Sequence, residues 1–190
     1  MVLDIVKYGN PILRQKGARI ERVTLEIKTL IADMLETMYA AKGIGLAAQQ
    51  VGRPLQLTVV DVRGATDRPS WLKIDGKEAD LNHWLPLVLI NPQVNPVGEP
   101  VAESEGCLSF PELYGHVARP RFAEVQSLNE KGQQVQFWCG GLLARAIQHE
   151  NDHLKGILFI DRMSRLDKEE LKKQLDQLQA ATRACLKAAK

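Results

Sequence analysis

The sequence is poor in cysteine and histidine, with three cysteines and four histidines among 190 residues. An odd, small number of cysteines argues against a disulfide framework, so we expect a reducing compartment, the cytoplasm. No apolar run approaches the roughly 18 residues of a membrane-spanning helix, and the first residues lack the layout of a signal peptide. The net charge of +2 gives no electrostatic reason to expect nucleic acid. We therefore expect neither DNA nor a membrane as a partner.

The rest of the composition is that of an ordinary globular protein. Apolar residues make up 45% of the chain and charged residues 25%. A chain of 190 residues is long enough for one domain with a hydrophobic core and short for two. There is no internal repeat or low-complexity tract. We predict a single domain that spans residues 1–190.

The most informative motif is H-E-x-x-H, formed by His149, Glu150 and His153. On a helix the two histidines lie at positions i and i+4 on one face, where they can bind one metal ion with Glu150 beside it as a base. Gly141 and Gly156 flank an apolar segment, which favours a helix between them. The alternative is a helix whose histidines are merely satisfied by hydrogen bonds. Because the chain has only four histidines, this spacing around a glutamate favours a metal site.

The residues alone leave the third ligand open, although a catalytic zinc-type centre uses three protein ligands. Glu169 and Glu170 would suit a peptidase of the zincin kind, but they fall in the first turn of a charged helix, where acids also favour the helix dipole. Upstream, Cys107 offers a thiolate, and a thiolate with two imidazoles suits zinc or Fe(II). Cys139 competes with it, although we interpret Cys139 as a packing residue at the end of a strand.

Hydrophobic periodicity predicts the remaining elements. A helix capped by Thr24 has apolar residues at spacings of three and four and ends at Gly43. A C-terminal helix follows at residues 167–190, with Asp167 and Glu170 as its cap. Residues 63–86 are polar and interrupted by glycine and proline, so we predict a long loop. Strands are predicted at residues 55–62, 87–90, 122–128 and 133–138.

Three motifs together resemble the signature motifs of peptide deformylases. They are Gly43-x-Gly45-x-Ala47-Ala48-x-Gln50, Glu105-Gly106-Cys107-Leu108-Ser109 and Gln148-His149-Glu150-x-Asp152-His153-Leu154-x-Gly156. They stand in the family's order, and the resemblance extends from residue 11 to residue 162. It implies an α+β fold in which antiparallel β-strands surround a central metal-binding helix, with an N-terminal helix and a C-terminal helix.

The resemblance implies a metal-dependent hydrolase that removes the N-formyl group from the N-terminal formylmethionine of newly made polypeptides. One divalent metal ion per chain is implied, Fe(II) in the cell, with zinc, nickel or cobalt as alternative occupants of purified protein. Cys107, His149 and His153 would hold the metal, with a water in the fourth position. Glu150 would take the proton of that water and return it to the departing amine.

The same resemblance assigns roles to residues around the metal. The side-chain amide of Gln50 and the backbone N–H of Leu108 would donate hydrogen bonds to the oxyanion. Gly45 would let the substrate backbone approach closely. Three residues resemble the family's apolar pocket for the methionine side chain: Ile44, Leu142 and Ala146.

We also have expectations for four charged residues near the site. Glu105 and Arg119 resemble a family pair that ties the Cys107 segment in place. We expect the head group of Arg145 to leave the pocket. Asp152 either supports the metal site or is an acid on the helix surface, and the sequence does not decide between these.

N-formylmethionyl peptides are the implied substrates, and the ribosome is a second expected partner. From Lys168 to Lys190 the tail carries six basic and three acidic residues, so it could dock on RNA near the exit tunnel or simply be a solvated surface. Two other functions stay open: a zincin peptidase and a non-catalytic relative that binds formylated or metal-bearing partners. The presence of Glu150 argues against the second.

Overall fold

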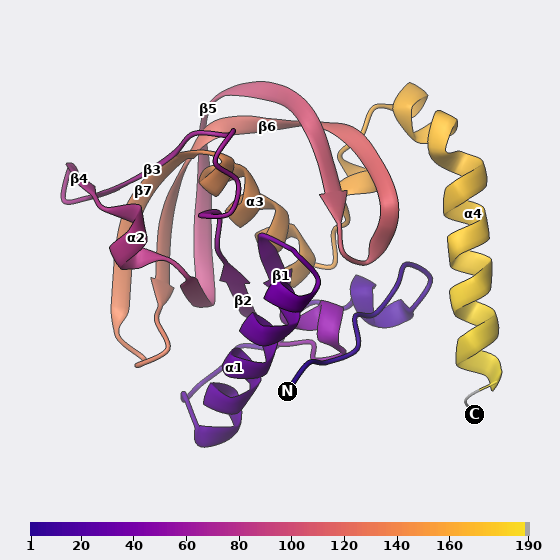
Figure 1. Ribbon diagram of the computed structural model, residues 1–190, viewed down its shortest axis with the longest axis horizontal. Coiled ribbons are helices and arrows are strands. Elements are labelled where there is room, and N and C mark those ends of the chain that lie inside the picture. Colours follow the sequence, from indigo (N-terminus) through magenta and orange to yellow (C-terminus); the bar gives the residue numbers. More distant parts are fainter. Residues whose placement is uncertain (189–190) are drawn as a thin grey trace.

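The computed structural model describes residues 1–188 and has an α+β architecture built on one antiparallel sheet (Figure 1). The strands are β1 (Gly45–Ala47), β2 (Leu57–Val60), β3 (Ser70–Ile74), β4 (Lys77–Ala79), β5 (Leu87–Cys107), β6 (Phe110–Leu128) and β7 (Gln134–Gly141). The helices are α1 (Leu25–Ala40), α2 (Leu81–Trp84), α3 (Leu142–Leu154) and α4 (Arg165–Ala188), with short 3-10 turns η1 (Pro11–Arg14), η2 (Ala48–Val51) and η3 (Phe159–Asp161). The strand order is β1-β2-β5-β6-β7-β3-β4.

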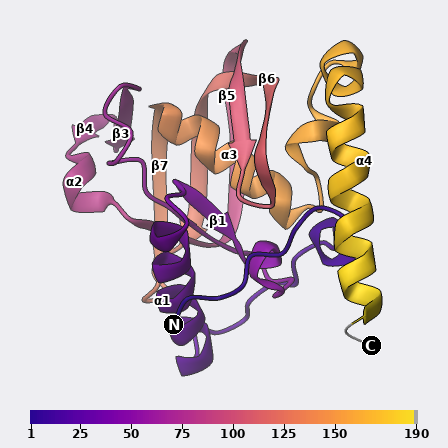
Figure 2. The ribbon, with the colours of Figure 1, turned by 45° about the vertical axis from the view of Figure 1, so that its right-hand side comes forward.

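Helix α3 lies at the centre of the molecule, and the strands surround it in two views (Figures 1 and 2). All 13 of its residues are buried. Gly141 starts it at a φ of 68°, and a Cβ there would lie 2.0 Å from the carbonyl oxygen of Pro69, so only glycine fits. Helices α1 and α4 pack on the outside. The predicted fold class, a central helix among antiparallel strands with a helix near each end, is confirmed.

The longest strands, β5 and β6, extend well beyond the predicted segments at 87–90 and 122–128. The predicted strand ends at residue 90, but β5 continues past Pro92, Pro96 and Pro100. The pairing with β6 has register shifts between residues 90 and 93 and between 97 and 100. Bulges of this kind accommodate residues that cannot donate to the ladder. Strands β5 and β6 thus form one long hairpin, whose tip lies at residues 107–110.

The predicted loop at residues 63–86 is wrong, because the segment contains β3, β4 and α2. Strand β3 pairs with β7, where Leu72 lies opposite Cys139. Both of these side chains are fully buried. The partner strand lies more than sixty residues further along the chain, so local polarity could not reveal the pairing.

The boundaries of the outer helices differ slightly from the prediction. Thr24 caps α1 as expected, accepting a hydrogen bond from the N–H of Ile27. The residue with positive φ after α1 is Lys42, at 54°, rather than Gly43. Helix α4 begins earlier than residue 167, and its cap is the Ser164 hydroxyl, which accepts from the N–H of Asp167 at 3.1 Å.

Helix α4 is fixed to the body of the protein by apolar side chains. Leu175 is buried in a cluster with Phe110 and Phe159, and Leu171 packs against the same cluster. Cys185, near the end of the helix, is exposed. The last two residues of the predicted tail helix, 189–190, lie outside the described residues. Across residues 1–188, none of the helices has both the length and the apolar character to cross a membrane.

Candidate active site

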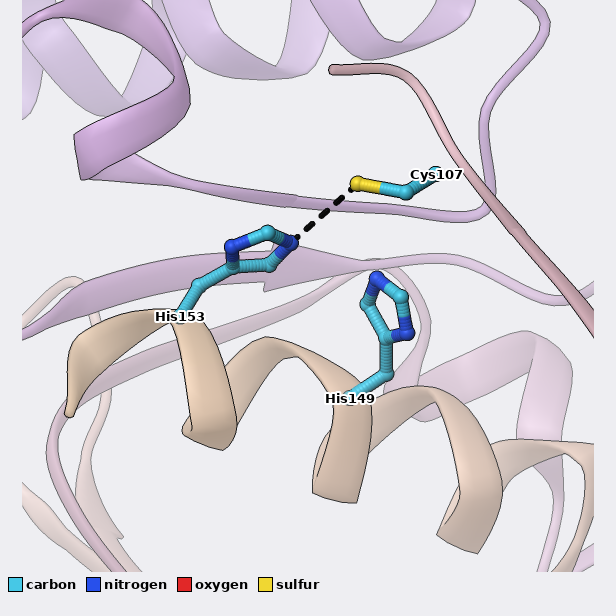
Figure 3. Close-up of side chains that lie close together, drawn as sticks. All are labelled: Cys107, His149 and His153. Carbon is cyan, nitrogen blue, oxygen red and sulfur yellow. Dashed lines mark hydrogen bonds between the residues drawn. The ribbon is translucent and has the colours of Figure 1, made fainter. Parts of the chain in front are cut away.

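A cysteine and two histidines meet where the tip of the β5–β6 hairpin faces α3 (Figure 3). His149 and His153 rise from one face of the helix toward Cys107. One ligand atom from each residue lies within 4.8 Å of the others, and Cys107 Sγ is 3.3 Å from His153 Nε2. One thiolate and two imidazoles form a donor set that suits zinc or Fe(II) and leaves a position open. The residues therefore fit a single catalytic metal ion.

The ring of His149 is oriented by Glu105. Glu105 Oε2 lies 3.0 Å from His149 Nδ1, which leaves Nε2 for the metal. Arg119 in turn donates to both carboxylate oxygens of Glu105, at 2.6 and 3.0 Å. Burial alone would raise the pKa of Glu105, but the hydrogen bonds from His149 and Arg119 lower it to about 2. Glu105 is therefore ionised where it contacts His149.

Two further arginines join this network, the buried Arg145 and the exposed Arg162. Arg145 Nη1 donates to Glu105 at 2.8 Å and to the carbonyl of Val117 at 3.0 Å. Asp152 accepts from Arg119 at 2.8 Å and from Arg162 at 2.7 Å. Asp152 is only 4% exposed, so it is a member of the network rather than an acid on the surface.

Glu150 lies beside the cluster as a buried carboxylate. It is 4% exposed, and its Oε2 atom has no hydrogen-bond partner among residues 1–188. Burial raises its pKa to about 7. The backbone of Gly45 passes so close that a Cβ there would lie 2.4 Å from Glu150 Oε1. Gly45 is thus required by the carboxylate itself.

The side-chain amide of Gln50 is held with its nitrogen toward the cluster. Its Oε1 accepts from the N–H of Ala47 at 2.8 Å. Its Nε2 lies 3.2 Å from Ser109 Oγ and 3.4 Å from Cys107 Sγ. Because the oxygen is already occupied, the donating end of the amide faces the site.

These side chains open into one cavity of about 480 Å³. Nine of the ten residues predicted for the site line it: Ile44, Gly45, Gln50, Cys107, Leu108, Leu142, Ala146, His149 and Glu150. The tenth, His153, is 1% exposed and lies one helical turn after His149, with its Nε2 3.3 Å from Cys107 Sγ. The structure thus brings together every residue that the sequence predicted for the site.

The competing third ligands lie elsewhere. Cys139 is fully buried in β7, where its Sγ lies 3.6 Å from the carbonyl oxygen of Ala123. Burial raises the pKa of its thiol to about 12, so it is a neutral packing residue. Glu169 and Glu170 are exposed on α4. Among residues 1–188, neither they nor Cys139 belongs to the cluster.

Three residues at the site were missed by the sequence analysis. Ser109 meets the Gln50 amide, and it lies inside a recognised motif, which was a usable signal. Arg162 pairs with Asp152, and Lys7 bonds the carbonyl of Leu108 at 2.8 Å. Lys7 and Leu108 are 101 positions apart, so no local pattern marks Lys7, and Arg162, 10 positions after Asp152, lies outside the three motifs.

The sequence model described as polypeptide deformylase matches residues 2–169. The chain belongs to the polypeptide deformylase family. Among peptide deformylases, that of Opitutus terrae is 44% identical over 189 residues, covering 98% of each chain. That of Methylacidiphilum infernorum is 46% identical over 178 residues, covering 94% of this chain and 93% of the relative.

Solved peptide deformylase structures share the fold. The enzyme from Synechococcus elongatus, solved in complex with actinonin, superposes with a TM-score of 0.76 at 42% identity, over 90% of this chain and 85% of that chain. The enzyme from Legionella pneumophila gives a TM-score of 0.78 at 32% identity, over 100% of this chain and 99% of that chain. The family relationship therefore spans the whole domain, including the Cys107 hairpin and α3.

Proposed function

We propose how this polypeptide deformylase performs the reaction of its family, removal of the N-formyl group from the N-terminal formylmethionine of newly made polypeptides. The observation that carries the proposal is the placement of Glu150 beside the Cys107, His149 and His153 cluster, with a carboxylate oxygen that has no partner among residues 1–188. Because the substrate is a product of translation, we place the enzyme in the cytoplasm.

Cys107, His149 and His153 would hold one divalent metal ion per chain. When bound, such an ion lowers the pKa of a water molecule to near neutrality and so supplies a nucleophile. We propose Fe(II) as the ion in the cell. Zinc, nickel or cobalt are alternatives in purified protein, because thiolate and imidazole ligands admit all of these metals. Glu105 keeps the His149 ring in the orientation that presents Nε2.

Glu150 would move the proton. Burial brings its pKa to about 7, so near neutrality it can both accept and return a proton. Oε2, which no group among residues 1–188 occupies, is the atom that would take the proton of the attacking water. Glu150 would then pass it to the nitrogen of the departing amine.

Gln50 Nε2 and the N–H of Leu108 would stabilise the negative charge that develops on the formyl oxygen. The Gln50 amide is already fixed by Ala47, so little reorganisation is needed when the charge appears. Three residues of the cavity wall would receive the methionine side chain: Ile44, Leu142 and Ala146. The backbone at Gly45 would lie against the substrate chain.

The test is anaerobic hydrolysis of a short formylmethionyl peptide, with formate release and bound metal measured on the same sample. We expect one metal per chain and equal amounts of formate and free amine. Cys107→Ala should lose both metal and turnover. Cys139→Ala is the matched control and should retain the metal, because Cys139 packs in β7. Full metal content in Cys107→Ala would overturn the ligand assignment.

We propose a second role for α4, docking on the ribosome, which the exposed basic residues Lys173, Arg183 and Lys187 support. Truncation of the helix would expose the apolar cluster around Leu175, so charge reversal is the cleaner test. The variant Lys173→Glu/Arg183→Glu should sediment less with ribosomes and turn over a short formyl peptide as the parent does. Unchanged ribosome affinity would rule the docking role out.

A further inference from the structure

The N-terminal segment joins the two parts of the chain that carry the proposed oxyanion donors. The N–H of Val6 donates to the backbone carbonyl of Gln50 at 2.8 Å. Two residues later, the N–H of Tyr8 donates to the carbonyl of Ser109 at 2.9 Å. Gln50 follows β1, whereas Ser109 lies in the tip of the β5–β6 hairpin, so these two bonds connect elements that are distant in sequence.

Lys7 stands between these two anchors and reaches into the same site. Its Nζ donates to the carbonyl oxygen of Leu108 at 2.8 Å, and its half-buried side chain lines the 480 Å³ cavity. Hydrogen bonds from an ammonium group are stronger than neutral ones. The carbonyls of two consecutive residues, Leu108 and Ser109, are therefore both held from the segment 6–8.

We propose that Lys7 is a positioning residue for the deformylase reaction, holding the Leu108 backbone so that its N–H points at the developing oxyanion. The inference rests on the proposed function of Leu108 as a donor. Among the described residues, the Lys7 ammonium hydrogen-bonds the Leu108 carbonyl and none of Cys107, His149 and His153, although it lies near enough to Cys107 to interact with it electrostatically. It acts through the backbone: the Leu108–Ser109 peptide, whose carbonyl it binds, is joined at the Leu108 Cα to the Cys107–Leu108 peptide that carries the donating N–H.

The expected consequence is a change in turnover rather than in binding. The hairpin tip that carries Leu108 has a register shift between Gly106 and Cys107, so the strand ladder does not fix this backbone by itself. Without the ammonium, Tyr8 alone would hold the tip from the N-terminal side. The negative charge on the formyl oxygen is absent from the bound substrate and develops as the tetrahedral species forms. A misaimed donor therefore lowers kcat with little effect on KM.

The experiment compares three variants with the parent enzyme, each loaded with metal, in kcat and KM for a short formylmethionyl peptide. Lys7→Met keeps the apolar stem and removes the ammonium, whereas Lys7→Arg restores a charged donor. Lys16→Met removes a lysine whose side chain is exposed outside the cavity and serves as the control. Metal content and thermal melting are recorded for every sample.

We expect kcat of Lys7→Met to fall about tenfold, less than the loss of a whole oxyanion donor, with KM and metal content unchanged. Lys7→Arg should return to within about threefold of the parent, and Lys16→Met should match it. Parental kcat in Lys7→Met, a loss explained by missing metal, or a Lys7→Arg enzyme as slow as Lys7→Met would each overturn the inference. An inactive parent would instead refute the proposed function.

Discussion

The close approach of Gly45 to Glu150 predicts a large effect from adding one methyl group. In Gly45→Ala the new Cβ would lie 2.4 Å from Glu150 Oε1 and 2.9 Å from its Cδ and Cγ. Ordinary contact begins near 3.4 Å, so one of the two groups must move by about an ångström. The Gly45 backbone is paired with Val60 in the sheet, so we expect the Glu150 carboxylate to be the group that shifts, into the cavity that it lines.

The size of the effect follows from what moves. Displacing a catalytic group by about 1 Å costs roughly a hundredfold in rate, and overpacking a buried site costs about 1–3 kcal/mol of stability. We therefore expect Gly45→Ala to lose about a hundredfold in kcat while it stays folded. The metal ligands are not displaced by the added methyl, so metal content should remain one per chain.

The assay is steady-state hydrolysis of a formylmethionyl peptide, with urea denaturation of the same preparation. Gly64→Ala is the matched control, because a Cβ at Gly64 meets nothing within 4 Å among the described residues. It should behave as the parent in both measurements. Turnover of Gly45→Ala within threefold of the parent would show that the carboxylate tolerates the displacement and that its position is not critical.

Other predictions concern stability. Arg119→Met should lower the free energy of unfolding in urea by about 3 kcal/mol, because it leaves the buried Glu105 charge short of a partner. Leu175→Ala should cost about 2–5 kcal/mol, measured in the same way, because it opens a cavity under α4. Although burial favours its neutral form, Asp161 has a lowered pKa because Arg14 donates to it. The ion pair with Arg14 therefore stabilises the fold at pH values above the ordinary aspartate pKa, and this contribution is lost as the pH falls. Between about pH 5 and pH 3, the free energy of unfolding should fall less for Asp161→Asn than for the parent.

The sequence predicts those features whose cause is local. Helix α3 follows from a helical apolar period between two glycines, and the i, i+4 spacing of His149 and His153 places both on one face. Cys107 required a family resemblance, since the residues alone left Cys139 and the downstream glutamates open. The hairpin folding that brings Cys107 within 3.3 Å of His153 is a long-range event.

The features that escaped prediction depend on contacts between distant segments. Strand β3 forms because it pairs with β7, whereas the polar sequence around β3 predicts a loop. In the sequence, the prolines of β5 indicate strand ends, whereas in the structure the bulged pairing with β6 accommodates them within one strand. Lys7 and Leu108 are separated by 101 positions, so no pattern along the chain connects them.

The most direct test of the account is the turnover of Glu150→Gln, measured together with its metal content. The substitution keeps the size of the side chain and removes the base, and general acid–base assistance is worth roughly a hundred- to ten-thousandfold. The account predicts one metal per chain, nearly unchanged KM and at least about a hundredfold loss of kcat. A Glu150→Gln enzyme that turns over formylmethionyl peptides within tenfold of the parent would contradict it, because another residue would then be moving the proton.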